Sequence, residues 1–383
     1  MSVADLALQR SKYKHLSDEE WRWFLQQVEG KERTADKLPT FAAIEDWWYP
    51  VRLSCEQCSS ELAARYKAEL VESRKTKDER HFADLTGGYG VDTYFLSEQF
   101  AHTDYVEQNA ELCRIAEHNF SLIDNRKSII VRNSSAEDFL ASAGQYDLIF
   151  IDPARRDSHG GKVFRLEDCT PNVVELLPTL LAHGKRLMIK LSPMLDLTQA
   201  VNNLQSDKVQ GTKVSWDVFV VAIKNEVKEV LLLSGGSGQI TAIDLDKKGQ
   251  AFVFTREEEQ KAIYDVQCTT YNFLYEPSAA ILKAGAYKLI AERFGLHKLD
   301  VNTHLYGSDT LIENFPGRVW KVVEKQDLKQ ANVLCRNYPL TPEQLKKKLH
   351  LRDGGTAYVI GCRVNNKPTL FFAERIEDIH TKS

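Results

Sequence analysis

Two patterns of apolar positions occur along this chain: short apolar runs, and stretches with apolar residues three or four positions apart. From residue 81 the two patterns alternate regularly. Short apolar runs predict strands, and stretches with apolar residues three or four positions apart predict helices. The expected segments are, in order, strand 81–85, helix 91–100, strand 103–108, helix 110–123, strand 128–133, helix 136–143, strand 146–152, helix 173–183 and strand 185–192. This alternation predicts an α/β fold, with a mostly parallel sheet covered by helices on both faces.

The run 214–236 has a different pattern, because it predicts two strands joined by a tight turn at Lys224 and Asn225. Such a hairpin gives the sheet an antiparallel last strand, an ending that dehydrogenase domains usually lack. Further strands are predicted at 239–245 and 250–255, where the signals are weaker.

The last part of the chain predicts a separate α+β module. An aromatic strand followed by a helix is expected within 271–295. A strand at 318–325, a helix at 340–350 and two strands at 356–364 and 369–376 follow.

Residues 1–80 are predicted to form a small helical domain. Ser17 and Glu20 have the spacing of a capping box that opens a helix. A second helix is expected over 41–48, stopped by Pro50, and a third over 55–74.

Composition excludes several classes of protein. With 383 residues, 43% hydrophobic and 27% charged, the chain is typical of a folded protein of two or three domains. No apolar run is long enough for a membrane span, and the polar N-terminus does not look like a signal peptide. Seven scattered cysteines do not predict a disulfide framework, so a cytoplasmic protein is expected. Cys55 and Cys58 form a lone C-x-x-C without further zinc ligands nearby, so no structural metal is expected.

Charge is unevenly distributed along the chain. The net charge of −4 argues against a protein that holds nucleic acid by bulk charge alone. Residues 271–383, however, carry 17 basic and 12 acidic side chains, a net of +5. This part of the chain is therefore the one expected to meet phosphates.

The strongest chemical pattern is a glycine-rich loop between the strand at 81–85 and the helix at 91–100. It reads Asp84-Leu85-Thr86-Gly87-Gly88-Tyr89-Gly90. The glycines do not have the G-x-G-x-x-G spacing of a dinucleotide site. Instead the loop resembles the acid-x-G-x-G-x-G pattern of class I S-adenosylmethionine-dependent methyltransferases, with Thr86 in the first glycine place. A generic turn capped by Asp84 is the alternative.

The next strands supply further candidate cofactor contacts. Glu107 ends the strand at 103–108, where a carboxylate can accept both ribose hydroxyls, although it could instead cap the following helix. Ser135 and Ala136 fall where the family usually has G-D-A-x-D-F. Ser135 thus replaces the aspartate that commonly receives the adenine amino group, and its hydroxyl would accept that bond more weakly.

The turn after the strand at 146–152 is the candidate catalytic segment. It reads Asp152-Pro153-Ala154-Arg155-Arg156. Methyltransferases that act on exocyclic amines carry [DN]-P-P-[YF] here, where the acid and a prolyl carbonyl accept the N–H groups of the target. In this chain the aromatic platform is missing. RNA uracil methyltransferases have D-P-P-R, but they need a nucleophilic cysteine after the next strand, which is absent here; Cys169 follows the wrong strand.

Several cations near the predicted edge are candidates for substrate contacts. Arg155 and Arg156 could bind a phosphate or carboxylate, or could form salt bridges with Asp157 or Glu167. Lys190 ends the strand at 185–192, where it points to the catalytic edge or lies with its stem buried on the rim.

A longer resemblance covers roughly residues 50–383. The strings LSCEQCSSELAARYKA, LIFIDPARRDSHGGKVFRLEDCTPNV and LYEPSAAILKAG are similar to a bacterial family of methyltransferases with a C-terminal THUMP-like domain, preceded by a small ferredoxin-like segment. The resemblance implies a methyltransferase domain over 81–240, a connector and ferredoxin-like segment over 241–315, and a THUMP-like domain over 316–383.

In the C-terminal module, Lys346, Lys347 and Arg352 are the candidate phosphate contacts, with a solvated helix face as the alternative. Tyr271, Phe273 and Tyr275 are expected in the core of a strand instead of in a base-stacking platform.

Together these features predict S-adenosylmethionine-dependent methylation, with S-adenosyl-L-homocysteine as product, of a nitrogen of an RNA. Asp152 and Pro153 would orient the acceptor, and Asp152 would also contact the cofactor. Two alternatives stay open: a protein or small-molecule methyltransferase, and a catalytically silent RNA-binding protein with a vestigial cofactor pocket.

Overall fold

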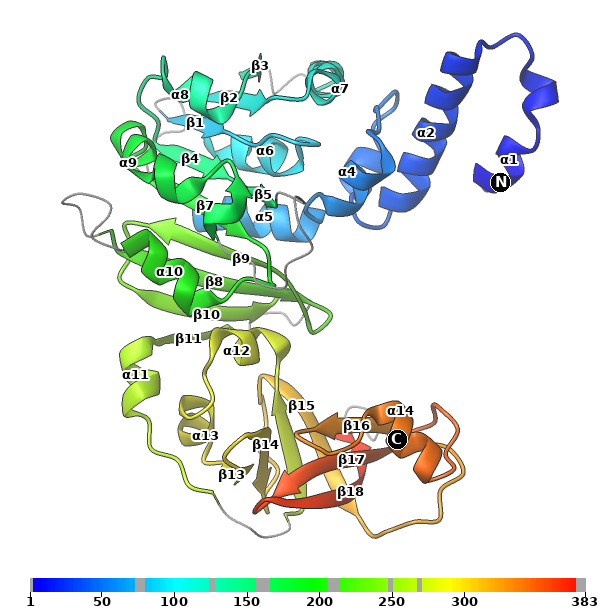
Figure 1. Cartoon of the computed structure of the whole chain (residues 1–383), viewed down its shortest axis with the longest axis vertical. Coiled ribbons are helices and arrows are strands. Elements are labelled where there is room, and N and C mark those ends of the chain that lie inside the picture. The colour runs from blue at the N-terminus through cyan, green and yellow to red at the C-terminus, as the bar shows by residue number, and fades with distance from the viewer. Residues whose placement is uncertain are drawn as a thin grey trace. The chain divides into compact units, whose positions relative to one another are not determined.

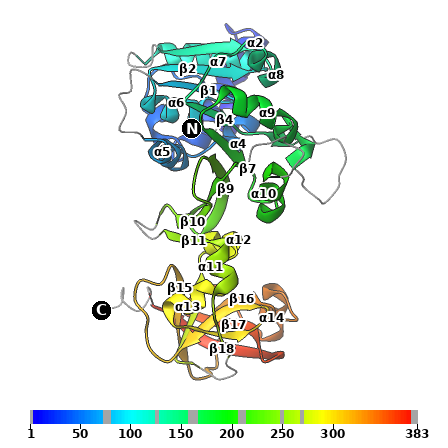
Figure 2. The same ribbon diagram turned by 90° about the vertical axis from the view of Figure 1, so that its left-hand side faces the viewer.

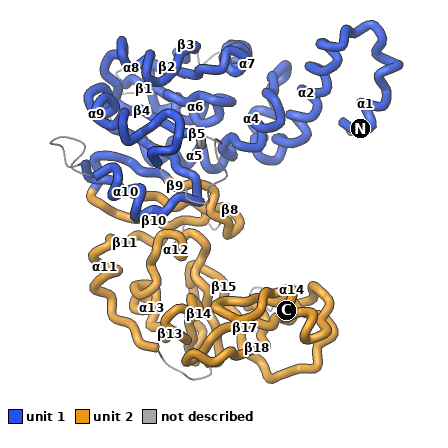
Figure 3. Tube along the Cα trace, in the orientation of Figure 1, with its two compact units in different colours: residues 1–216, 231–236 blue, residues 217–230, 237–383 orange. Residues whose placement is uncertain are grey.

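A computed structural model of the protein describes residues 3–72, 80–123, 128–155, 166–205, 214–246, 251–266 and 271–376. The chain divides into two compact units (Figure 3). Unit 1 comprises residues 1–216 and 231–236, and unit 2 comprises residues 217–230 and 237–383. The four domain boundaries expected from sequence stay a proposal. Within the described residues, no helix has both the length and the apolar character needed to cross a membrane.

Unit 1 contains the mostly parallel sheet that the sequence predicts. The strand order is β7-β4-β1-β2-β3, and these neighbours pair in parallel. The strands are β1 (His81–Asp84), β2 (His102–Glu107), β3 (Ile129–Asn133), β4 (Leu148–Ile151) and β7 (Leu187–Leu191). A short antiparallel pair, β5 (Ala154–Arg155) with β6 (Cys169–Thr170), follows β4.

Helices cover both faces of this sheet, as expected (Figures 1 and 2). One face carries α5 (Glu61–Leu70), α6 (Val91–Leu96) and α7 (Ala110–Ser121). The other carries α8 (Ala136–Leu140), α9 (Val173–His183) and α10 (Leu197–Gln205). The helix α10 was not among the elements predicted from sequence.

The N-terminal helices depart from the prediction in two places. The first long helix, α2 (Asp18–Thr34), has the expected capping box between Ser17 and Glu20, and α1 (Val3–Ala7) precedes it. The helix expected over 41–48 is wrong, because only the four-residue α3 (Pro39–Ala42) forms. Asp46 adopts a left-handed φ of 58°, which a helix interior does not accommodate.

The single helix expected over 55–74 is also wrong. It is split into α4 (Arg52–Gln57) and α5, because Cys58 and Ser60 adopt extended backbone angles. The Ser60 hydroxyl accepts a hydrogen bond from the Ala63 amide and so caps α5 at its N-terminus. The break leaves Cys58 and Ser59 outside any helix, and both line the cavity at the candidate site.

The N-terminal segment shares a core with the sheet. Phe41, Trp47 and Tyr49 are buried in the same cluster as Phe95 of α6 and Phe120 of α7. An edge-to-face contact connects the two segments, with 5.0 Å between the ring centroids of Phe41 and Tyr94 of α6. The N-terminal helices are therefore fixed against the part of the sheet that carries the glycine loop.

The predicted hairpin forms, and its residues 217–230 belong to unit 2. The strands β8 (Trp216–Ile223) and β9 (Glu226–Ser234) are joined at Lys224 and Asn225, whose φ angles of 53° and 59° suit a two-residue hairpin turn. β10 (Gln239–Asp244) pairs in parallel with β8, and β11 (Phe252–Thr255) pairs antiparallel with β10.

The rest of unit 2 is a seven-stranded sheet of order β13-β14-β12-β15-β18-β17-β16. Its strands are β12 (Phe273–Pro277), β13 (His297–Asp300), β14 (Thr303–Ser308), β15 (Gly317–Val323), β16 (Asn332–Arg336), β17 (Ala357–Val364) and β18 (Lys367–Arg375). The helices are α11 (Arg256–Lys261), α12 (Ala279–Ala284), α13 (Leu289–Phe294) and α14 (Pro342–Lys348). Tyr271 and Tyr275 are buried, as predicted, whereas Phe273 is half-buried.

Candidate active site

A cavity of about 290 Å³ lies in unit 1 at the carboxyl ends of the parallel strands. In open α/β sheets this edge is where ligands bind. The structure brings together at this cavity the residues that the sequence indicated. They are the glycine loop, Glu107, Ser135, Ala136, Asp152 and Lys190. The N-terminal segment also lines the cavity, with residues that were not predicted from sequence to be part of the site. They are Ser54, Gln57, Cys58 and Ser59.

The glycines of the loop have different roles. A Cβ on Gly87 would lie 2.2 Å from the ring of Tyr105, so only glycine fits against that buried ring. Gly88 and Gly90 have φ angles of 55° and 83°, in the left-handed region that favours glycine. A Cβ on Gly88 would meet only the Thr86 carbonyl oxygen, at 3.7 Å, so the loop is open on this side.

Asp84 and Thr86 tie the loop to its surroundings. The fully buried Asp84 carboxylate accepts hydrogen bonds from the Thr86 amide at 3.0 Å and the Thr93 hydroxyl at 2.6 Å. Burial raises the pKa of Asp84 to about 7, although these two hydrogen bonds act in the opposite direction. The Thr86 hydroxyl in turn accepts a bond of 2.7 Å from the amide of Asp152. The acid at the end of β1 is thus first of all a support for the loop.

Glu107 lies at the end of β2, beside the loop. Its Oε2 accepts a bond of 3.0 Å from the Gly88 amide, and its Oε1 accepts one of 2.8 Å from the Asn109 amide. These bonds fix the plane of a half-buried carboxylate at the cavity wall. Asn109, and not Glu107, caps α7, so the capping alternative for Glu107 is wrong.

Ser135 caps α8, where its hydroxyl accepts from the Asp138 amide at 3.0 Å and donates to the Asp138 carboxylate at 2.8 Å. Its proton is therefore already used, and one lone pair is left for a ligand donor. Ala136, the next residue, is buried at the cavity wall.

Asp152 follows β4 and pairs with Lys190 of β7. The Asp152 Oδ2 and Lys190 Nζ atoms are 2.5 Å apart, and the two side chains are 37% and 12% exposed. The Lys190 ammonium thus points to Asp152 at the cavity, and its stem is largely buried, so both interpretations of Lys190 stay open. Within the described part of the chain, the Lys190 ammonium forms an ion pair with the candidate catalytic carboxylate of Asp152.

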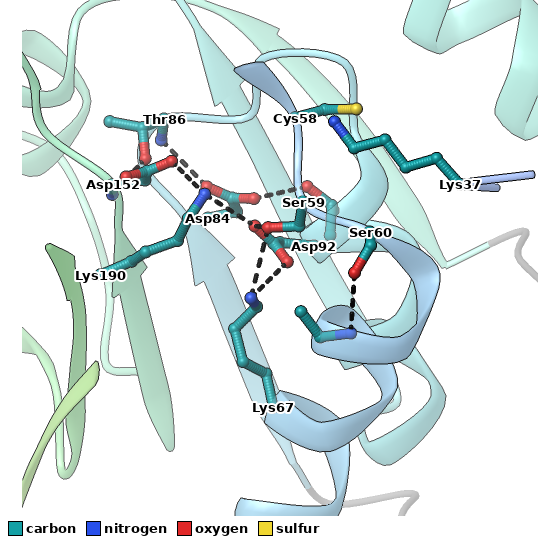
Figure 4. A network of polar contacts seen from close by, with 12 residues as sticks. Lys37, Cys58, Ser59, Ser60, Lys67, Asp84, Thr86, Asp92, Asp152 and Lys190 are labelled. Atoms are coloured by element: carbon teal, nitrogen blue, oxygen red, sulfur yellow. Dashed lines mark hydrogen bonds and ion pairs between the residues drawn. The ribbon is translucent and has the colours of Figure 1, made fainter. Parts of the chain in front are cut away.

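A buried polar network extends from this pair to the N-terminal helices (Figure 4). Lys190 also lies 3.5 Å from the Asp92 carboxylate of α6, which pairs with Lys67 of α5 at 3.2 Å. The Ser59 hydroxyl donates to Asp92 at 2.7 Å. Burial alone disfavours the charge on Asp92, but the cations of Lys67 and Lys190 outweigh it and hold the pKa of Asp92 below its ordinary value.

The two cysteines of the C-x-x-C pair differ in position. Cys58 lines the cavity, and Cys55 is buried in α4. Burial raises the pKa of both thiols, that of Cys55 to about 12, so neither is a thiolate at neutral pH. The described residues contain no group of three or more His, Cys, Asp or Glu side chains that could hold a metal ion.

The remaining candidates lie elsewhere or outside the described part. Pro153 is half-buried next to Asp152, and the backbone of Arg155 is in β5; its side chain and Arg156 fall outside the described residues. Lys346 and Lys347 lie in the last turn of α14 in unit 2, and Arg352 follows that helix. Lys346 pairs with Asp353 at 2.8 Å, and Lys347 and Arg352 are exposed.

Comparison with known proteins gives a consistent result. Residues 273–316 match a ferredoxin-like domain family, and residues 316–375 match a THUMP domain-like family. Two Mycobacterium tuberculosis proteins, each named uncharacterized S-adenosylmethionine-dependent methyltransferase, are 21% identical over 360 residues, which cover 89% of this chain and 92% of each relative. A crystal structure of a proposed methyltransferase from Porphyromonas gingivalis is 30% identical, with a TM-score of 0.81, over 94% of this chain and 92% of that chain.

Proposed function

Since the chain belongs to the class I S-adenosylmethionine-dependent methyltransferase family that carries a C-terminal THUMP-like domain, we propose that it methylates a nitrogen of an RNA. The observation that carries the proposal is the Asp152 carboxylate at the cavity, paired with Lys190 and tied to the glycine loop through Thr86. The cofactor is S-adenosyl-L-methionine, and its product is S-adenosyl-L-homocysteine.

The residues around the cavity fit this cofactor. Gly88 leaves the loop open where a side chain would fill it, and Glu107 presents a fixed carboxylate suited to two ribose hydroxyls. Ser135 and Ala136 would flank the adenine, and Asp84 would act through the loop it supports. When bound, the cofactor supplies an electrophilic methyl group on a sulfonium.

Asp152 is the proposed catalytic residue. Its Oδ2 is held by Lys190, so Oδ1 is the oxygen that would accept an N–H of the target. The carbonyl of Pro153 would accept a second N–H. Methylation of a nitrogen releases one proton, which the partly exposed Asp152 carboxylate can take and pass to water. The main contribution of the chain is thus positioning.

An RNA acceptor is supported by the C-terminal part of the chain. Residues 316–375 resemble the THUMP domain, and residues 271–383 carry the excess of basic side chains. Exposed Lys347 and Arg352 would contact phosphates. Arg155 and Arg156, which follow Asp152 in sequence, would do the same. Lys190 was a candidate substrate contact, and its pairing with Asp152 supports a positioning role instead.

The test is transfer of labelled methyl groups from the cofactor to RNA isolated from a strain that lacks this protein. Label in the RNA fraction, located on a nitrogen by nucleoside analysis, is the expected result. The Asp152→Asn variant should lose at least about 100-fold in rate and keep its affinity for S-adenosyl-L-homocysteine. If label instead enters protein or small molecules while the cofactor binds normally, the RNA proposal is wrong.

A further inference from the structure

The reaction edge is connected to the N-terminal helices by four charges of alternating sign. Lys67 of α5 pairs with Asp92 of α6 at 3.2 Å, Asp92 lies 3.5 Å from Lys190 of β7, and Lys190 lies 2.5 Å from Asp152. Figure 4 shows the side chains converging from four separate segments of the chain. Lys190 therefore stands between two carboxylates that can compete for it.

Lys67 is unusual because its side chain has no exposed surface. A fully buried ammonium group is costly unless it is paired and hydrogen-bonded. Here it donates to the Ser59 hydroxyl at 3.3 Å, and Ser59 donates to Asp92 at 2.7 Å. Ser59 is available for this contact only because the chain breaks between α4 and α5.

We propose that Lys67 and Ser59 are positioning residues of the methyl-transfer site: by neutralising Asp92, they leave Lys190 committed to Asp152, which is thereby kept oriented. The shorter distance from Lys190 to Asp152 than to Asp92 agrees with this assignment. The assignment rests on the proposed function, since it concerns the residue that would accept the proton.

Other titratable groups face the same four charges. Asp84 lies close enough to Asp92 and Asp152 for their charges to contribute to its raised pKa, and Cys58 adjoins Asp92 and Lys190. Glu107 lines the same cavity. All three residues are present in every variant.

The first experiment needs no acceptor substrate. Calorimetry on the full chain gives the affinity for S-adenosyl-L-methionine, whose sulfur is cationic, relative to S-adenosyl-L-homocysteine, whose sulfur is neutral. Lys67→Met removes one positive charge and should raise this affinity ratio about threefold. Adding Asp92→Asn restores the balance of charge, so the double variant should return to the ratio of the unsubstituted protein. Lys185→Met, which removes an exposed lysine paired with the half-buried Asp147, is the matched control and should leave the ratio unchanged.

The second experiment measures the pH profile of methyl transfer. In Lys67→Met, Asp92 draws Lys190 away from Asp152. The Asp152 carboxylate then loses the cation that favours its charged form, so the rate should rise at higher pH than in the unsubstituted protein. The double variant should recover the original profile. Ser59→Ala keeps every charge, so it should shift the profile in the same direction without changing the affinity ratio.

A purely structural network would predict otherwise. Lys67→Met would then lower the melting temperature but change neither the affinity ratio nor the pH profile. The double variant would be less stable than both Lys67→Met and the unsubstituted protein. That result overturns the inference. If Lys67→Met does not fold, an unshifted profile in Ser59→Ala overturns it. If no RNA accepts a methyl group, the RNA proposal fails, while the affinity ratios still decide the charge coupling.

Discussion

The backbone amide of Asp152 donates a hydrogen bond of 2.7 Å to the side-chain hydroxyl of Thr86. The bond joins the turn after β4 to the glycine loop after β1, two segments 66 residues apart in sequence. A glycine in the place of Thr86, as in the family pattern, could not accept this bond. The threonine is therefore a connection between the loop proposed to hold the cofactor and the proposed catalytic residue.

Removing this hydroxyl should loosen the turn that carries Asp152. Thr86→Val keeps the shape of the side chain but leaves the Asp152 amide without its acceptor, so the free energy of unfolding should fall by about 1–2 kcal/mol. Urea denaturation measures the change. Thr86→Ser keeps the hydroxyl and is the matched control, and equal stability of the valine and serine variants would contradict the prediction.

Gly87 should be intolerant of any side chain. Its Cβ would lie 2.2 Å from the Tyr105 ring, which is fully buried and cannot move away cheaply. Gly87→Ala should therefore lower the free energy of unfolding by about 1–3 kcal/mol and weaken binding of S-adenosyl-L-homocysteine. Gly144→Ala is the control, because a Cβ there meets nothing within 4 Å. Thermal melting with and without S-adenosyl-L-homocysteine measures both effects. Equal melting temperatures and equal ligand-induced shifts in the two variants would show that the prediction is wrong.

Much of this site could be predicted from the sequence because its parts are local. Three parts of the site lie at or just after the end of a strand: the loop 84–90, Glu107 and Asp152. The parallel sheet brings these strand ends to one edge. Their presence at the cavity follows from the alternation of strands and helices alone.

The network behind Asp152 could not be predicted in the same way. Lys67 appears in sequence as an ordinary helical lysine, and Asp92 as an acid in the first turn of a helix. Their contact depends on how α5 packs on α6, and Ser59 depends on a helix break that the helical period of residues 55–74 conceals. A serine pair, Ser59 and Ser60, was the only local signal of that break.

The stability of the protein should depend on pH through Asp84. Burial raises the pKa of its carboxyl from an ordinary 3.8 to about 7, so the folded state holds a proton that the unfolded state releases. The contribution of Asp84 is thus fully present below about pH 4 and is lost as pH rises to about 7, at up to about 1.4 kcal/mol per pH unit. Asp84→Asn should abolish this loss. Urea denaturation of both proteins from pH 5 to pH 8 would contradict the prediction if their stability difference were independent of pH.

Glu107 should determine cofactor affinity more than stability. Glu107→Gln keeps one acceptor oxygen for the backbone amides but leaves a poorer partner for two ribose hydroxyls, so affinity for S-adenosyl-L-homocysteine should fall about 10-fold or more. Calorimetry measures this loss. Glu111→Gln, which changes an exposed acid in the first turn of α7, is the control. Equal affinities for the two variants would mean that the carboxylate of Glu107 only supports the loop.

The C-terminal basic residues should set the salt dependence of RNA binding. Lys347 and Arg352 are exposed, so each would release counterions on meeting a phosphate, whereas Lys346 is already paired with Asp353. The double variant Lys347→Glu/Arg352→Glu should therefore bind total RNA more weakly and reduce the slope of log affinity against log salt by about 1–2. Lys261→Glu, in the exposed α11, should leave that slope unchanged. If both variants keep the original slope in filter-binding titrations, the RNA is held elsewhere, and the excess of basic side chains after residue 271 is a solvated surface.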